Sequence, residues 1–568
     1  MTVADDGRFT GTGFVTLGSA PGSVGGLVLT DSGALNIDYT GTGAQLLVGD
    51  QGTGSASQTG TSSVTTGSLR VGVQGGSTGT YTMDGGTLGV DDGSGVAGGM
   101  RIGLAGNGTF TQNGGAVNAA YVQIGGANFG QGGGGSGTYN LNGGQLVASG
   151  NVDINVDDNS FGILNVAGGA LAAGNIFNND QLNYSAGSLS ANVSNSANFN
   201  VSGGAQRTLT GNLSNNAGGV LDTAAATPLL VTGVLTNAAT GQIQAGANIT
   251  VGADYNNLAA GNGNAFNHRA NVTGAGLILA AGNVTQAITG AVIGGTTASP
   301  VLDFGNVRVG ASVTRNYQIA NTGTTGPDLR GAIQTSVNGG NITDVRLTGS
   351  GVTAGNFGPV GIGASSGNQA VNFNASSAGA LTGQAVHIAN NFDNVQDQTI
   401  EIAGAAFNAA VGNATPTPVV LANQRVGGSL SQQLTVANTA DAGAFSEDLN
   451  ASFGANTGGA TNNGGSVDGL LAGSSNSAAM NVGVDTATAG AKSGTVTLNY
   501  QTAGTVNGVS NGLGTASAGS QEITITGDVY RLAEGSATPD PVNFGNVHLN
   551  AAVSQSLAGR TAVLHLLP

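Results

Sequence analysis

The feature that most constrains the fold is a phrase that recurs at constant spacing. Tyr81, Phe110 and Tyr139 lie 29 residues apart, each inside a Gly-Thr-aromatic phrase that ends in Gly-Gly. An apolar-any-apolar triplet closed by Gly alternates with this phrase, as in Leu69-Arg-Val-Gly72 and Met100-Arg-Ile-Gly103. A period of this length is typical of arrays of one supersecondary unit, and the alternation between Gly-rich turns indicates short strands. The period therefore predicts stacked strands, with the three rings on one face of neighbouring coils.

Composition is compatible with this architecture. Gly accounts for 104 of the 568 residues, charged residues for 7%, and Trp and Cys are absent. High Gly content can indicate disorder, but 39% of the residues are hydrophobic and their pattern is regular, which favours an ordered β structure. Stacked repeats can bury ladders of small aliphatic side chains in one continuous core.

Related phrases continue through the first half of the chain, for example Leu164–Leu171 and Phe199–Ala205, and then Gly211–Leu221 and Gly233–Ile243. We interpret residues 1–295 as a right-handed parallel β-helix. With about 20–30 residues per coil and about 4.8 Å between coils, it would form a rod of roughly 50–60 Å.

A second repeat follows. Val301–Gly310 returns as Val419–Gly427, and Asn321 and Asn438 are 117 residues apart. Alternating strands in units of this length are typical of immunoglobulin-like β-sandwiches, so we predict one sandwich at residues 299–411 and another at 415–533. The strand residues that we expect to face inward are Val313, Tyr317 and Ile319 in the first unit and Leu430, Leu434 and Val436 in the second. We also expect the sandwiches to fold independently of the β-helix.

The sequence that opens each sandwich appears a third time as Val542–Leu549 and Val553–Leu557. Phe544 of this copy is only 24 residues from the last residue, Pro568. We therefore expect residues 536–568 to be the truncated start of a third sandwich, mobile or loosely docked, with the reading frame interrupted near Leu557. An isolated strand pair is at best marginal in water.

The repeats resemble two families. The sandwich units, with Phe304-Gly-Asn-Val307 and Ile319-Ala-Asn-Thr-Gly323, resemble choice-of-anchor D modules, relatives of the hydin-type immunoglobulin-like domains. The Gly79–Leu88 phrases are similar to the strand repeats of autotransporter passengers. Both resemblances imply a bacterial protein at the outer cell surface or outside the cell, and neither brings a catalytic residue with it. The chain departs from both in having no signal peptide and no terminal anchor, which favours a fragment.

Charge and composition exclude several classes of partner. The net charge of −16, with only 13 basic residues, argues against nucleic-acid binding because no basic stripe can neutralise phosphates. The absence of Cys excludes a disulfide framework and a thiolate metal site. No run of about 18 apolar residues is present to span a membrane.

Candidate chemistry is sparse. The four histidines, His268, His387, His548 and His565, are scattered and have no partner at metal-ligand spacing. Asp153, Asp157 and Asp158 imitate part of a calcium loop, but its Gly and its final Glu are missing, and the pair Asp91-Asp92 reads as a turn. We predict no metal, no cofactor and no catalytic residue.

Two alternatives remain open. A carbohydrate-active β-helix enzyme, a lyase or hydrolase, would need Asp153, Asp157 and Arg101 to converge in one groove. The pairs Thr80/Thr82 and Thr109/Thr111 align as on ice-binding helices, but Asn140 breaks the series. We favour a non-catalytic stalk or adhesin-like protein that presents a repeat surface to an unknown ligand, such as a glycan or a host or biofilm matrix.

Overall fold

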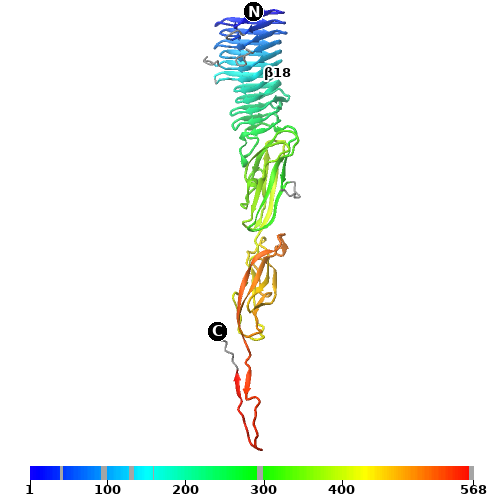
Figure 1. The fold of residues 1–568 in the computed structure, drawn as a ribbon. Coiled ribbons are helices and arrows are strands. Elements are labelled where there is room, and N and C mark those ends of the chain that lie inside the picture. Colours follow the sequence, from blue (N-terminus) through cyan, green and yellow to red (C-terminus); the bar gives the residue numbers. More distant parts are fainter. Residues whose placement is uncertain (39–42, 91–98, 127–133, 158, 291–298, 562–568) are drawn as a thin grey trace.

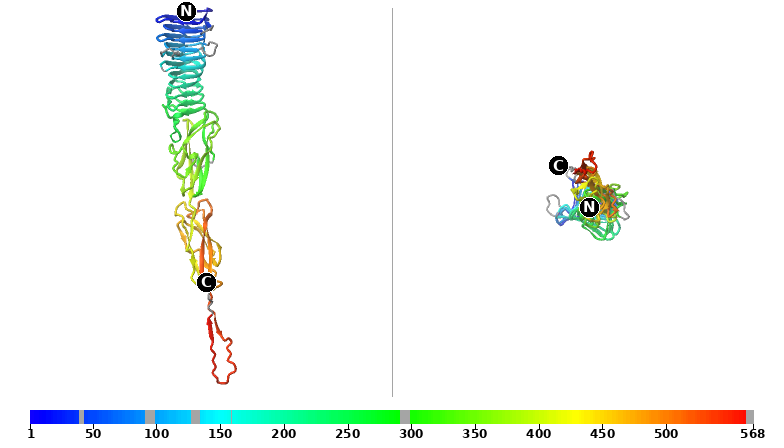
Figure 2. Two further views of the ribbon diagram at one scale, coloured as in Figure 1. Left: turned by 60° about the vertical axis from the view of Figure 1, so that its left-hand side comes forward. Right: turned by 90° about the horizontal axis from the view of Figure 1, so that it is seen from below.

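The computed structural model describes residues 1–38, 43–90, 99–126, 134–157, 159–290 and 299–561. The predicted all-β class is confirmed: strands dominate, and short 3-10 turns are the helical elements of these residues. The molecule is elongated, with a stack of strands at the N-terminal end, two sandwich units below it and a narrow ribbon at the other end (Figure 1). A view along the long axis shows these parts projected onto one another (Figure 2). The 3-10 turns are η1 (Leu258–Ala260), η2 (Gly263–Ala265) and η3 (Ser350–Val352).

The stack is one parallel sheet of 30 described strands, arranged in three columns. Along a column, most strands pair with the third strand before and the third strand after them in sequence. The first column contains β1 (Thr2–Val3), β4 (Val24–Leu29), β7 (Thr53–Gln58), β10 (Thr78–Met83), β13 (Asn107–Gln112), β16 (Ser136–Leu141), β20 (Asn198–Val201), β23 (Val220–Thr223), β26 (Gln242–Ala245) and β29 (Val272–Thr273).

The other two columns repeat this arrangement. The second contains β2 (Arg8–Thr12), β5 (Ala34–Asp38), β8 (Ser63–Thr66), β11 (Thr87–Val90), β14 (Ala116–Ala119), β21 (Arg207–Thr210), β24 (Leu229–Val231), β27 (Ile249–Val251) and β30 (Ile278–Ala280). The third contains β3 (Phe14–Leu17), β6 (Gln45–Val48), β9 (Ser68–Val71), β12 (Gly99–Ile102), β15 (Tyr121–Ile124), β22 (Leu213–Asn215), β25 (Leu235–Asn237) and β28 (Tyr255–Asn257). Three long strands bend across columns, namely β17 (Gln145–Ile154), β18 (Phe161–Asn178) and β19 (Gln181–Asn195).

The recurrent aromatic residues stack inside the first column, as predicted. Tyr81 is in register with Phe110, which is in register with Tyr139. The ring centroids of each pair are 4.9 Å apart, and all three side chains are fully buried. Each buried tyrosine hydroxyl donates a hydrogen bond to a glutamine side chain of the preceding coil, Gln58 or Gln112. The period is therefore set by a ring stack whose polar atoms have partners.

The glycine that closes each apolar triplet is required by the backbone. Gly103 has φ +71°, and a Cβ atom there would lie 2.1 Å from the carbonyl oxygen of Ser136 on the next coil. A left-handed φ and this close approach both favour Gly over other residues. The triplet thus ends at a corner where the next coil passes directly over the turn.

A buried asparagine ladder runs down the third column in the lower half of the stack, where Asn178 is in register with Ile154 of the preceding coil. Asn178, Asn195, Asn215 and Asn237 are almost completely buried. Their side chains are hydrogen-bonded from one coil to the next at 2.6 Å and then twice at 2.8 Å. Because buried amides need partners, the recurring Asn of this region fixes the register of successive coils.

The parallel stack ends at β30, ahead of the predicted boundary at 295. The next strand, β31 (Gln286–Gly290), pairs antiparallel with β33 (Ser312–Asn321) and so belongs to the first sandwich. The sheets of this unit have the orders β31-β33-β37-β35 and β32-β40-β39-β34-β36, with β38 beside β40. Their remaining strands are β32 (Val301–Arg308), β34 (Leu329–Gln334), β35 (Leu347–Thr348), β36 (Gly355–Val360), β37 (Gln369–Asn374), β38 (Gly379–Ala380), β39 (Gln384–Asn390) and β40 (Gln398–Phe407).

The core of the stack and the core of the first sandwich are continuous. Buried side chains from Leu17 to Ala406 form a single cluster that includes Tyr317 and Ile319, both predicted to face inward. Across the boundary, the rings of Tyr255 and Phe392 are 6.3 Å apart. This packing argues against the predicted independent folding of the first sandwich and the repeat region.

The second sandwich has a separate core. Its strands are β41 (Gly412–Thr415), β42 (Val419–Val420), β43 (Gln424–Arg425), β44 (Ser431–Gln433), β45 (Thr435–Asn438), β46 (Leu449–Asn456), β47 (Ala460–Asn462), β48 (Ser466–Leu470), β49 (Ser475–Asn476), β50 (Asn481–Val484), β51 (Gly490–Thr502), β52 (Thr505–Val506), β53 (Val509–Ser510) and β54 (Ala516–Tyr530). The repeat is visible in the topology, since β42 pairs in parallel with β54 as β32 does with β40. Leu434 and Val436 are buried as predicted. Leu430 is 46% exposed, because β44 begins after it, and its predicted inward position is wrong.

The third copy of the opening text forms no sandwich strand in the described residues. Residues 542–549 are exposed and irregular, and β55 (Gly535–Thr538) pairs only with β56 (Ala558–Thr561) as an antiparallel ribbon. Val542, Phe544 and Leu549, whose counterparts in a complete unit would be strand residues, are exposed. This ribbon is the red segment of Figure 1.

We expect trypsin to cut this ribbon first. Arg531 precedes it and Arg560 lies in β56, and both are exposed, whereas Arg346 is almost completely buried. A time course followed by mass spectrometry should show an early product that ends at Arg531 and then persists. Early cleavage at Arg346 would contradict the described packing.

Candidate functional site

The histidines remain separate. His268 lies between the stack and the first sandwich, His387 contacts Thr399 and Asp397, and His548 is exposed in the ribbon. His565 lies outside the described residues. Within the described ranges, no three His, Asp or Glu side chains are grouped so that they could hold a metal ion.

The residues that an enzyme would need are spread along one column. Arg101, Gln123 and Asp153 occupy successive register positions of the third column, so Arg101 and Asp153 are two strand spacings apart, roughly 10 Å. The Arg101 Nε–H donates to Gln123 Oε1 at 2.8 Å, and its guanidinium lies 5.2 Å from the centre of the Tyr121 ring. Among the described residues, no hydrogen bond or ion pair joins Arg101 to Asp153.

The remaining acidic candidates do not complete a site. Asp157 lies in the turn after β17, where its carboxylate accepts the backbone N–H of Asn159 at 3.1 Å. Burial disfavours the charged form of Asp153 and so raises the pKa of its carboxyl group. Asp158, Asp91 and Asp92 lie outside the described residues. Thr80/Thr82 and Thr109/Thr111 are in register, and the second row continues with Asn140.

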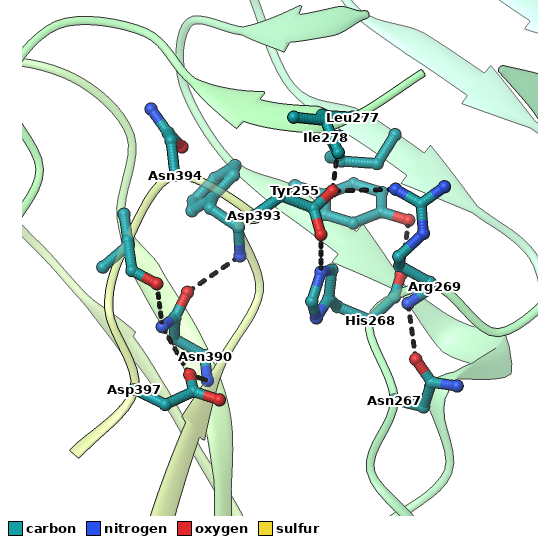
Figure 3. A network of polar contacts seen from close by, with 12 residues as sticks. Tyr255, Asn267, His268, Arg269, Leu277, Ile278, Asn390, Asp393, Asn394 and Asp397 are labelled. Atoms are coloured by element: carbon teal, nitrogen blue, oxygen red, sulfur yellow. Dashed lines mark hydrogen bonds and ion pairs between the residues drawn. The ribbon is translucent and has the colours of Figure 1, made fainter. Parts of the chain in front are cut away.

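A polar network joins the stack to the first sandwich (Figure 3). Asp393, in the loop between β39 and β40, accepts a hydrogen bond from the backbone N–H of Ile278 at 2.7 Å. Its carboxylate also lies 3.0 Å from His268 Nε2 and 2.8 Å from Arg269 Nη1. Three residues from the stack thus hold one carboxylate from the sandwich.

The same loop covers the last strand of the stack. Asn394 Nδ2 donates to the carbonyl of Ala280 at 3.1 Å, and its Oδ1 accepts the Ala280 N–H at 2.9 Å. Asn391 Nδ2 donates to the Tyr255 carbonyl at 2.9 Å. Exposed strand edges invite association with other chains, so this loop closes the open end of the stack with polar partners. We call Tyr255, His268, Arg269, Asp393 and Asn394 the upper junction.

Electrostatics hold Asp393 in its ionised form. Burial alone raises the pKa of Asp393, but the hydrogen bonds from His268, Ile278 and Arg269 outweigh it and lower the pKa to about 2. A carboxylate with such a pKa and with all these partners is a poor general base near neutral pH. The chemistry of the upper junction is that of an anchor.

Stability should therefore fall in acid through Asp393. Its folded pKa of about 2 lies below the ordinary value of 3.8, so the stabilisation is complete above about pH 4 and is lost as the pH falls towards 2. We expect the melting temperature of the stack and first sandwich to drop over this window more steeply in the wild type than in Asp393→Asn. Parallel pH slopes in thermal scans of the two proteins would contradict this assignment.

A cavity of about 220 Å³ lies beside the upper junction. Its walls include Tyr255, Leu258, Phe266, Arg330, Asn356 and Phe357. Arg330 is bound to Asp254 at 2.8 Å, which adds another ion pair between sandwich and stack. The charged wall residues of the cavity are already paired, Arg330 with Asp254 and His268 with Asp393.

A second polar junction joins the two sandwiches. Arg308 at the end of β32 contacts the Glu447 carboxylate at 2.8 and 3.1 Å, and Glu447 is completely buried. Burial raises the pKa of Glu447, but hydrogen bonds from Arg308, Thr502 and Asn511 outweigh it, and the pKa is lowered. The rings of Phe407 and Phe445 lie 5.4 Å apart across the same boundary. We call Arg308, Glu447, Thr502 and Asn511 the lower junction.

The sequence did not point to either junction. Asp393 is separated from His268 by 125 residues, and Arg308 from Glu447 by 139. Arg308 does recur in the sandwich repeat, as Arg425 117 residues later, but the repeat gives no indication that Glu447 is its partner. The one available signal was the scarcity of charge, because only 13 basic residues exist and several of them occur at these boundaries.

Comparisons with known proteins give little further information. The chain matches none of the protein-family models and none of the curated proteins searched. Among solved structures it is similar to titin A168–A169, at 10% identity with 43% of this chain and 98% of that chain covered, with a TM-score of 0.16. It is also similar to CfaE, the adhesive subunit of CFA/I fimbria of enterotoxigenic Escherichia coli, at 9% identity with coverages of 43% and 87% and a TM-score of 0.15. Scores this low carry no argument. Among the described residues, no helix has the length and apolar character needed to cross a membrane.

Proposed function

We propose that this chain is a non-catalytic, extended stalk or adhesin-like protein that works at the bacterial cell surface or outside the cell. The observation that carries the proposal is the linear arrangement of three units with a polar junction at each boundary (Figure 2). At both places an acidic side chain on one unit, mostly buried at Asp393 and fully buried at Glu447, is held by a basic side chain of the neighbouring unit. Such joints favour a straight rod that spaces its far end from an anchor.

We further infer that the stack is a right-handed parallel β-helix and that the sandwiches are immunoglobulin-like modules of the choice-of-anchor D type. The three columns of parallel strands support the first inference, since crossovers between parallel strands are right-handed in nearly all known cases. The parallel pairing of opening and closing strands, shared by both sandwiches, supports their common origin.

The arrangement of charges supports a non-catalytic role. General acid–base chemistry needs a proton donor and an acceptor within reach of one substrate atom. In the described residues, Arg101 is engaged by Gln123, and the carboxylates of Asp393 and Glu447 bind cations across domain boundaries. In their ionised, paired form these carboxylates stabilise the contacts between neighbouring units.

Incubation with polysaccharides tests the proposal against an enzyme. The full chain is mixed with neutral and acidic polysaccharides, and new reducing ends and unsaturated sugars are measured over a day. We expect no increase above a heat-denatured control. Release of oligosaccharides that is abolished by Asp153→Asn would show that the protein is an enzyme.

A further inference from the structure

A row of amide side chains runs along the outside of the first column. Asn140, Asn165, Asn183 and Asn200 occupy one register position on four successive strands. Their side chains are hydrogen-bonded in order, from Asn165 to Asn140 at 2.7 Å, from Asn183 to Asn165 at 2.7 Å and from Asn200 to Asn183 at 2.9 Å. We call these four residues the outer amide row.

The row is partly exposed and is held in one conformation. All four side chains are intermediate in exposure, and they alternate with buried residues such as Leu164 and Phe199. A primary amide has two N–H groups, and each of Asn165, Asn183 and Asn200 uses one of them along the row. The second N–H has no partner among the described residues, so the row presents a donor at every strand spacing, about 4.8 Å.

The strands that carry the row have no charged outward residue, and two acidic residues border it. Asp222 on β23 is in register with Asn200, and Asp180, just before β19, accepts the backbone N–H of Gly162 at 2.8 Å. The outward positions of the first column from β4 to β20 are Ser, Thr, Asn, Gln, Gly or apolar residues in the described structure, and Asp222 on β23 is the first charged one. This is notable in a chain of net charge −16. A face rich in neutral donors and acceptors, bordered only by acidic side chains, complements a neutral polyhydroxylated partner and offers no cation to an anionic one.

An exposed aromatic ring borders the row. Phe161 begins the strand that carries Asn165, lies level with Ser136 and is 45% exposed. Ile163, between them, is also partly exposed. The electron-rich face of an aromatic ring attracts C–H groups, which line the faces of sugar rings. One strand therefore offers both kinds of contact, four residues or about 13 Å apart.

We infer that the outer amide row, with Phe161 at its edge, is a binding surface for a neutral polysaccharide chain that lies along the stack. This inference rests on the proposed adhesive function and names its ligand class. Successive sugar units repeat at a length similar to the strand spacing, so several units can meet equivalent donors. Because the amides already hold one another in place, binding loses little side-chain entropy.

The test compares two double variants of the full chain. Asn165→Asp/Asn183→Asp removes two outward donors and adds two charges on the row. The matched control, Asn151→Asp/Asn175→Asp, makes the same change in another amide pair, which is hydrogen-bonded at 3.1 Å on β17 and β18 outside this face. Binding is measured by affinity electrophoresis in gels that contain dextran, galactomannan, xyloglucan or, as the acidic arm, alginate. Circular dichroism verifies the fold of each variant.

We expect retardation by at least one neutral polysaccharide, a loss of at least tenfold in affinity for the row variant and for Phe161→Ala, and a change below twofold for the control. Absence of retardation by all three neutral polymers, preference for alginate, or equal losses in row and control variants would overturn the inference. Failure of binding alone leaves the stalk proposal intact, whereas release of oligosaccharides from a bound polymer would refute the stalk proposal.

Discussion

Replacing Phe110 by Ala should destabilise the protein by about 3–5 kcal/mol, the range for removing a buried phenylalanine ring. Phe110 is the middle ring of the stack, with Tyr81 and Tyr139 each at 4.9 Å. Its loss removes two ring contacts and leaves a void that neighbouring coils cannot fill, because register hydrogen bonds hold them on both sides. The free energy of unfolding is measured by urea denaturation with circular dichroism.

Phe161→Ala is the matched control for this substitution. It deletes the same ring from the same column at a position that is 45% exposed. We expect it to lower the free energy of unfolding by less than about 1 kcal/mol, because exposed side chains contribute little to stability. Equal effects of the two substitutions, or a cost below about 1 kcal/mol for Phe110→Ala, would show that the ring stack does not stabilise the fold.

Replacing Glu447 by Gln should destabilise the second sandwich by about 3 kcal/mol and loosen its attachment to the first. Breaking a buried ion pair by removing one partner typically costs about 3–5 kcal/mol, and Arg308 is 24% exposed, so water compensates part of the loss. The second sandwich has its own core. We therefore expect its transition to shift while that of the stack and first sandwich stays in place.

Glu522→Gln provides the control, since this exposed carboxylate on β54 carries the same charge in the same unit. Its effect should be within about 0.5 kcal/mol, as for most surface substitutions. The assignment of the lower junction fails if both variants melt like the wild type. It also fails if Glu447→Gln shifts the transition of the stack by the same amount.

Periodic features of this chain could be predicted from the sequence because they are local. The 29-residue spacing of Tyr81, Phe110 and Tyr139 returns each ring to one position, and the structure confirms their stacking. Gly103 marks a corner because backbone geometry and the next coil both exclude a side chain. Repetition makes such requirements visible, since the same constraint acts on every coil.

Features that occur once were not predictable in this way. The upper junction depends on Asp393 meeting His268 and Arg269 from a loop more than 120 residues away. The strand Gln286–Gly290 resembles the preceding repeats, yet it pairs with β33, because the loop at Asp393 already occupies the end of the stack. Leu430 continues an alternating pattern, but strand β44 begins only at Ser431, so the pattern alone placed it wrongly.

The candidate binding surface was predictable in part, because only some of its residues recur at regular spacing. The threonine pairs on β10 and β13 of the first column were visible in the sequence, and their break at Asn140 argued against one regular array. The structure shows that the break starts a second array, in which amides replace hydroxyls at the same register position. Irregular spacing, 25 residues from Asn140 to Asn165 and 18 from there to Asn183, hid this continuity.

Small-angle X-ray scattering of the full chain tests the central claim, that three units form one straight rod. With both junctions closed, the account predicts a pair-distance distribution that peaks early and falls almost linearly to a long maximum distance, the form expected for a rod. The double variant Asp393→Asn/Glu447→Gln should lose this form and show a broader distribution with a dimensionless Kratky plot typical of hinged units. A wild-type curve that already shows hinged or compact units would contradict the account.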